Sequence, residues 1–199
     1  MQTPEKLLQA WAMPIVSDST RGGVAAQAFW IVFFSVLTAV GARVEIPQEP
    51  VPYTLQTFFV LLAGAFLGMR NGSLSQFAYL VAGAAGAPVF AGGDAGLARL
   101  LGPSGGYLFA FPVAAFLVGW LVQQRRGLVW TLLSMAVGLL VIFVFGTVQL
   151  NVVYLHDWRA AIQSGFLIFS WWDLLKLGAA AMIYGQFARR WSTLPPEKR

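Results

Sequence analysis

The chain has 199 residues, of which 58% are hydrophobic and only 11% are charged. A soluble domain has about half apolar and about a quarter charged residues, so this composition excludes a water-soluble globular domain and a disordered chain. The sequence has no cysteine, which excludes disulfides and Cys-based metal sites. A helical membrane protein remains. The net charge of +5 is typical of nucleic-acid binding, but the basic residues lie between apolar segments and are better explained by the membrane surface.

Six apolar stretches predict six transmembrane helices that form one bundle, because about 20 predominantly apolar residues are needed to cross a bilayer. The third stretch is short and rich in Gly and Ala, and small residues let helices approach closely, so we expect it inside the bundle. In chain order the predicted helices are Val24–Ala42, Val51–Leu67, Leu74–Val89, Gly106–Val122, Leu128–Leu150 and Phe166–Phe187.

The basic residues predict the orientation of this bundle. With six helices, one side of the membrane has three of the basic residues, Arg43, Arg99 and Arg159. The other side has nine: Lys6, Arg21, Arg70, Arg125, Arg126, Arg189, Arg190, Lys198 and Arg199. Because cytoplasmic loops carry the excess of Lys and Arg, both termini are predicted to be cytoplasmic.

The chain is therefore predicted to be one multi-pass domain in the cell membrane, covering residues 24–188. Residues 1–23 are expected to form a cytoplasmic segment on the inner membrane surface, and residues 189–199 a cytoplasmic tail.

Two charged residues, Asp173 and Lys176, fall inside the last predicted helix. A charge at the middle of a bilayer costs about 2.5–3.5 kcal/mol on insertion scales, so such residues are candidates for a functional site. At a spacing of three residues they share one helical face and can pair. The alternative is an ion pair that only attaches the last helix to the bundle.

Two outer loops have unusual compositions. The stretch from Gly92 to Tyr107 contains six glycines, which allow close backbone approach to a ligand, together with apolar residues that favour packing on the bundle. The stretch from Arg43 to Thr57 contains three prolines that hold it extended. Together with the last helix, these loops are predicted to form one pocket for a small amphipathic molecule with an anionic end and a polar ring. An inert connector is the alternative for each loop.

Other functions lack their signatures. His156 is the only histidine and is predicted to be a solvated loop residue, so neither a catalytic metal centre nor a serine–histidine hydrolase is expected. The phosphate-binding loop of nucleotide-driven pumps is also missing. No cofactor is predicted, and the pattern favours a binding subunit that needs a partner.

Four motifs resemble the BioY family, the biotin-capturing S components of energy-coupling factor transporters. They occur in the same order over residues 24–188, as PVPYTLQT from Pro50, GAPVFAGG from Gly86, GPSGGY from Gly102 and DLLK from Asp173. The resemblance implies a six-helix bundle that binds biotin near the outer face under the first loop. It also implies a transmembrane coupling subunit and ATP-hydrolysing subunits as partners.

The resemblance predicts roles for the site residues. Asp173 would accept the ureido N–H groups of biotin, and Lys176 would donate to the ureido oxygen. Arg99 or loop amides would bind the carboxylate, and aromatic residues would pack on the thiophane ring. The predicted biotin-binding residues are Asp173, Lys176, Tyr107, Gly106, Gly105, Arg99, Phe90, Gln56, Thr54 and Trp172.

Three alternatives stay open from the sequence. The first is a solitary biotin carrier that works without the coupling complex. The second is an intramembrane enzyme acting on a lipid-like acid, which would need a nucleophile besides Asp173 and Lys176. The third is a structural membrane scaffold, against which the intramembrane charge pair argues.

Overall fold

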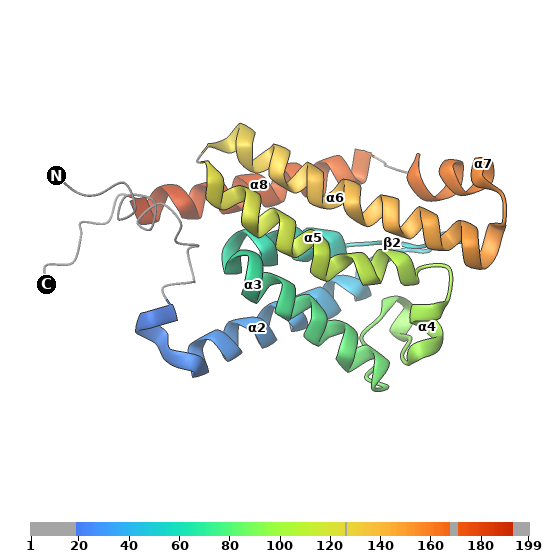
Figure 1. Cartoon of the computed structure of the whole chain (residues 1–199), viewed down its shortest axis with the longest axis horizontal. Coiled ribbons are helices and arrows are strands. Elements are labelled where there is room, and N and C mark those ends of the chain that lie inside the picture. The colour runs from blue at the N-terminus through green and yellow to red at the C-terminus, as the bar shows by residue number, and fades with distance from the viewer. Residues whose placement is uncertain (1–18, 126, 168–170, 193–199) are drawn as a thin grey trace, which may run out of the picture.

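The computed structural model describes residues 19–125, 127–167 and 171–192. The predicted surface segment up to residue 18 and the tail from residue 193 lie outside the described residues. Within these ranges the chain is almost entirely helical (Figure 1). The long helices are α2 (Ser19–Arg43), α3 (Gln56–Ala84), α5 (Gly105–Gln124), α6 (Leu128–Leu150) and α8 (Trp171–Ser192).

Short elements connect these helices. Strands β1 (Glu45–Ile46) and β2 (Tyr53–Thr54) pair antiparallel in the loop after α2. The remaining elements are the 3₁₀ turn η1 (Ala91–Gly93), helix α4 (Leu97–Leu101), the π-helical turn η2 (Asn151–Leu155), helix α7 (Trp158–Ala161) and the π-helical turn η3 (Ile162–Phe166).

Four helices in the described part of the chain are long and apolar enough to cross a membrane. They are Val24–Arg43, Gln56–Ala84, Gly105–Gln124 and Leu128–Leu155. The prediction of an all-helical protein with several membrane-crossing helices is therefore confirmed.

Helix α3 is a helical hairpin rather than one straight rod. Gly68 has φ 74° and ψ −179°, which is outside the helical region, in the middle of the element. A Cβ added to Gly72 would lie 2.9 Å from the Ala63 carbonyl oxygen, whereas nine residues of straight helix span about 13 Å. The chain therefore reverses at Gly68, between the two helices that the sequence predicts over 51–67 and 74–89.

Several predicted helix bounds were wrong. The first helix begins at Ser19 rather than Val24, and the helix predicted over 74–89 ends at Ala84. The second predicted helix begins at Gln56 rather than Val51, because β2 pairs with β1 and the prolines before it disfavour helix. The last helix is described from Trp171, and its predicted start, Phe166, ends the π-helical turn η3 instead. In contrast, α6 has the predicted bounds, Leu128–Leu150.

Helix α3 lies at the centre of the bundle and packs against α2, α5 and α8, while α6 packs against α5 and α8. A buried polar contact joins α2 to the second half of α3. The Thr38 hydroxyl lies 3.2 Å from Gln76 Oε1, and both side chains are inaccessible to solvent. Hydrogen bonds of this kind hold helices together where apolar packing gives no preference over lipid.

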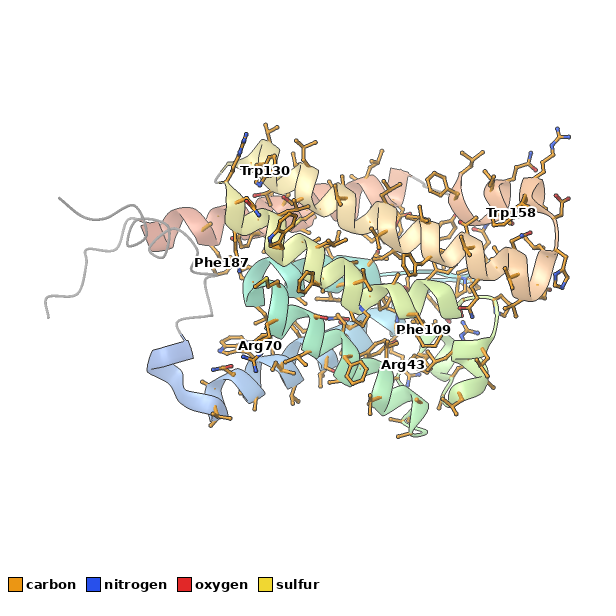
Figure 2. The ribbon with its side chains drawn as sticks, viewed as in Figure 1. Arg43, Arg70, Phe109, Trp130, Trp158 and Phe187 are labelled. Atoms are coloured by element: carbon orange, nitrogen blue, oxygen red, sulfur yellow. The ribbon has the colours of Figure 1, made fainter. Side chains whose placement is uncertain are left out.

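The glycine-rich loop folds back on the bundle, as its composition predicts. Phe90 and Leu100 are buried in a core cluster with α3 and α5, whereas Leu97 and Leu101 are exposed. Figure 2 places Trp130 and Phe187 toward the end of the bundle where α5 joins α6, and Trp158 at the opposite end.

Candidate functional site

A cavity opens between the first loop, the glycine-rich loop and the four long helices α3, α5, α6 and α8. It is lined from four directions: by the β2 strand and the start of α3, by η1 and α4, by α5 and α6, and by α8. The lining residues are Val51, Pro52, Tyr53, Thr54, Gln56, Thr57, Ala91, Arg99, Ser104, Tyr107, Leu108, Phe111, Ile142, Phe143, Asp173 and Lys176.

The charged end of the cavity is the pair formed by Asp173 and Lys176. Lys176 Nζ lies 2.5 Å from Asp173 Oδ1, and the two side chains are only 5% and 3% exposed. The predicted pairing is therefore confirmed. Lys176 also donates to the Thr54 carbonyl oxygen at 3.0 Å and to Thr57 Oγ1 at 2.9 Å. Since an ammonium has three donors, these three acceptors satisfy the buried charge and tie α8 to the start of α3.

Gln56 extends this polar network away from α8. Its Oε1 accepts a hydrogen bond from Thr54 Oγ1 at 2.8 Å, and its Nε2 lies 2.5 Å from the Tyr79 hydroxyl. Tyr79 in turn donates to the Val89 carbonyl oxygen at 3.1 Å. The chain of contacts fixes the first turn of α3 against the second half of the α3 hairpin and the glycine-rich loop.

Tyr53 lies in the loop strand β2, beside the charged end. Burial, together with the negative charge of Asp173, raises the pKa of Tyr53 above its ordinary value. The side chain is therefore a neutral phenol at physiological pH and can offer a hydroxyl to a ligand.

Helix α4 and the turn after it provide a second polar end of the cavity. Arg99 forms an ion pair with Asp94 at 3.0 Å, and these side chains are 26% and 53% exposed. Gln149 of α6 donates to the carbonyl oxygens of Leu100 and Gly102 at 2.9 and 3.0 Å, which holds the turn in place. Figure 1 draws α4 and α8 apart, on either side of α5, and residues of both helices line the cavity.

The rest of the cavity lining is an apolar wall. It is formed by one face of α5 and one turn of α6, with Tyr107, Leu108, Phe111, Ile142 and Phe143. The Tyr107 ring packs edge-to-face on Phe143, and its hydroxyl donates to the Gly165 carbonyl oxygen at 2.9 Å. The cavity is thus shaped for a molecule that is apolar in the middle and polar at both ends.

Six of the ten predicted site residues line this cavity: Thr54, Gln56, Arg99, Tyr107, Asp173 and Lys176. Phe90 does not line it, because its fully buried ring packs on Gly83 and edge-to-face on Tyr79. Trp172 is half-buried beside Asp173 and is not part of the lining either.

Gly105 and Gly106 are also outside the lining, and their role is close packing. A Cβ on Gly105 would lie 1.7 Å from the Leu100 carbonyl oxygen, and one on Gly106 would lie 2.4 Å from the Phe145 carbonyl oxygen. These glycines allow α5 to approach the α4 turn and α6, and so they position the residues next to them.

Sequence reasoning missed several lining residues. Phe111 lies one turn after Tyr107 on α5, so helical spacing from Tyr107 is the signal that finds it. Ser104 lies within the GPSGGY motif, one residue before the predicted glycines. No signal distinguishes Ile142 and Phe143, because they lie in the apolar run Gly138–Gly146 of α6, in which every residue is apolar.

Comparisons with known proteins agree with this architecture. The sequence profile of the BioY family matches residues 12–193. The biotin transporter BioY of Thermotoga maritima is 46% identical over 150 residues, which cover 75% of this chain and 88% of that protein. The probable biotin transporter BioY of Pyrococcus horikoshii is 42% identical over 159 residues, covering 80% and 94% of the two chains.

One solved structure has the same fold. The crystal structure of the S-component for biotin from an ECF-type ABC transporter matches with a TM-score of 0.77 over 95% of both chains, at 23% sequence identity. From the family profile and the sequence relatives together, this chain belongs to the BioY family.

Proposed function

We propose that this protein is the substrate-binding membrane subunit of a biotin uptake system. The observation that carries the proposal is the buried Asp173–Lys176 pair, which lines a cavity although a charge pair inside a membrane bundle is costly. A ligand that hydrogen-bonds to both groups accounts for their place in the cavity lining. The relatives named as biotin transporters identify biotin as the ligand to test.

The chemistry of biotin matches the charged end. Its ureido ring has two N–H donors on one side and one carbonyl acceptor on the other. Asp173 would accept from the N–H groups, since a carboxylate can accept several hydrogen bonds at once. Lys176 would donate to the ureido oxygen, which would take the place of one of its protein acceptors. Hydrogen bonds to ionised groups are about twice as strong as neutral ones.

The remainder of biotin matches the rest of the cavity. The thiophane ring and aliphatic chain would lie along Tyr107, Phe111 and Phe143, and the carboxylate would reach Arg99. Thr54 and Gln56 would hold the first turn of α3 in the position that Lys176 requires. The protein would thus bind the ligand without chemical turnover, as a transport subunit does.

We further propose six membrane spans, with both termini in the cytoplasm. The reversal at Gly68 supports counting α3 as two spans, which leaves α2, α5, α6 and α8 as the others. The 22 residues of α8 are long enough to cross a bilayer. Figure 2 draws Arg70, Trp130 and Phe187 toward the same end of the bundle, which we propose to be cytoplasmic, and Figure 1 draws α4 toward the other end.

Transport from this site would need partners. We propose that a transmembrane coupling subunit and ATP-hydrolysing subunits in the cell membrane drive release of biotin to the cytoplasm. Labelled biotin uptake should then depend on co-expression of those subunits. Equal uptake in cells that lack any coupling subunit would instead support a solitary carrier.

Calorimetry on protein purified in mild detergent tests the binding function. Wild-type protein should bind biotin, and Asp173→Asn should weaken binding by about 1.5–3 kcal/mol, the usual value of a hydrogen bond to a charged group. Asp157→Asn is the matched control, because Asp157 is an exposed cap of α7 and Asn caps a helix equally well. Unchanged affinity in Asp173→Asn would remove Asp173 from the site.

A further inference from the structure

Ser104 is a buried polar residue of the cavity lining that takes no part in the hydrogen bonds of Lys176, Gln56 or Gln149. Its residue surface is only 8% exposed, and its hydroxyl oxygen is fully buried. In the part of the chain that the structure describes, this oxygen has no hydrogen-bond partner. A buried hydroxyl without a partner costs about 1–3 kcal/mol, so its retention at a cavity wall calls for a physical reason.

Helix capping does not supply that reason. Ser104 occupies the N-cap position of α5, where a serine oxygen ordinarily accepts a hydrogen bond from the first turn of its helix. Here its backbone is in the right-handed helical region (φ −90°, ψ −5°), and its side chain makes no cap hydrogen bond. The hydroxyl is therefore available to a group that enters the cavity.

The position of Ser104 indicates which part of a ligand it meets. It follows α4, which carries Arg99, and both residues line the cavity. Gln149 of α6 holds the segment between them through the carbonyl oxygens of Leu100 and Gly102. The positive end of the α5 dipole points to the same place, and this end of a helix favours anions. The Asp173–Lys176 pair belongs to the other polar end of the lining, on α8.

From this arrangement we propose that the Ser104 hydroxyl donates a hydrogen bond to the carboxylate of the bound ligand and so selects for the free acid. Ser104 and Arg99 together form the acid-recognition end of the cavity. The inference rests on the proposed function, because it takes biotin as the molecule whose ring occupies the other polar end.

The test compares biotin with biotinamide, in which a neutral amide replaces the carboxylate and the ring system is unchanged. Ser104→Ala and Ser104→Gly both remove the hydroxyl, and both residues fit the backbone conformation. We expect each to lower the affinity for biotin about 10-fold, as for a charge-assisted hydrogen bond, and to change the affinity for biotinamide less than about twofold.

Ser134→Ala is the matched control, since it removes a buried hydroxyl of α6 that bonds to its own helix at Trp130 outside the cavity lining. It should leave both affinities unchanged. In an Arg99→Gln background, Ser104→Ala should cost less than in wild type, because the two side chains share one carboxylate.

Equal losses for biotin and biotinamide, or no loss for biotin, would overturn the role of Ser104. That result differs from failure of the proposed function, in which wild-type protein would bind neither compound. Thermal unfolding of each variant shows whether a loss reflects the site or the fold, and a loss of both ligands in a folded variant counts against the proposal.

Discussion

Lys176 and Asp173 are one turn apart on α8, and their charged atoms meet at 2.5 Å in a place where both side chains are more than nine-tenths buried. The Lys176 ammonium also joins α8 to the Thr54 carbonyl and the Thr57 hydroxyl at the start of α3. The same pair is therefore an interhelical contact and one end of the cavity. Its stability role and its binding role can be separated by mutation.

Lys176→Met should destabilise the protein by about 3–5 kcal/mol, because it leaves the Asp173 carboxylate buried without its counter-charge. Adding Asp173→Asn to Lys176→Met removes that charge and should recover most of the loss. The free energy of unfolding in detergent, measured for the two single variants and the double variant, checks the expectation. Additive losses in the double variant would show that the two charges are not coupled.

The recovery of stability in the double variant should not extend to ligand binding. The double variant lacks both groups proposed to contact the ureido ring, so it should be folded and yet fail to bind biotin in calorimetry. A stable double variant that binds biotin as wild type does would contradict the proposed role of the pair.

Asp94→Asn should strengthen biotin binding about two- to fivefold at low salt. Asp94 is half-exposed and pairs with Arg99 at 3.0 Å, so it competes with a ligand carboxylate for the same guanidinium. An exposed ion pair contributes only about 0–1 kcal/mol, which makes the stability cost of removing it small. The gain should shrink in 0.5 M salt because the charges are screened within about a few ångströms.

Calorimetry at two salt concentrations, with biotin and biotinamide, measures this effect. Asp157→Asn removes one negative charge outside the cavity lining and controls for net charge. If Asp94→Asn weakens binding instead, Asp94 orients Arg99 for the ligand rather than competing for it.

Gly119→Ala should lower stability by about 1–3 kcal/mol, the usual cost of overpacking. A Cβ at Gly119 would lie 2.4 Å from the Gly68 carbonyl carbon and the Met69 nitrogen, and these backbone atoms belong to the reversal of α3. Gly178→Ala is the matched control in α8, since its Cβ would meet no atom within 4 Å. Thermal unfolding midpoints in detergent distinguish the two variants. Equal midpoints would show that α3 and α5 can move apart enough to admit the added methyl group without loss of stability.

Several features could be predicted from the sequence because their causes are local. The bounds of α6 follow from a predominantly apolar run between Gly127 and Asn151. The contact of Asp173 with Lys176 follows from helical spacing, which places residues three apart on one face. The membrane class follows from composition alone, since a chain with 11% charged residues cannot solvate its own surface in water.

The other features of the site could not be predicted, because they depend on contacts between residues far apart in the sequence. Lys176 meets Thr54 and Thr57 more than a hundred residues earlier in the chain, and no local pattern encodes that distance. Phe90 and Gly105 lie in motifs that suggested ligand contact, but packing turns the ring of Phe90 inward and places backbone of the α4 turn against Gly105.

The amino-acid sequence by itself determined that this is a helical membrane protein with a charge pair in its last helix, because hydropathy and helical spacing act within one segment. Only the tertiary structure decided that Ser104 and Arg99 line one cavity with that pair, because the loops and helices that carry them come together only when the bundle packs.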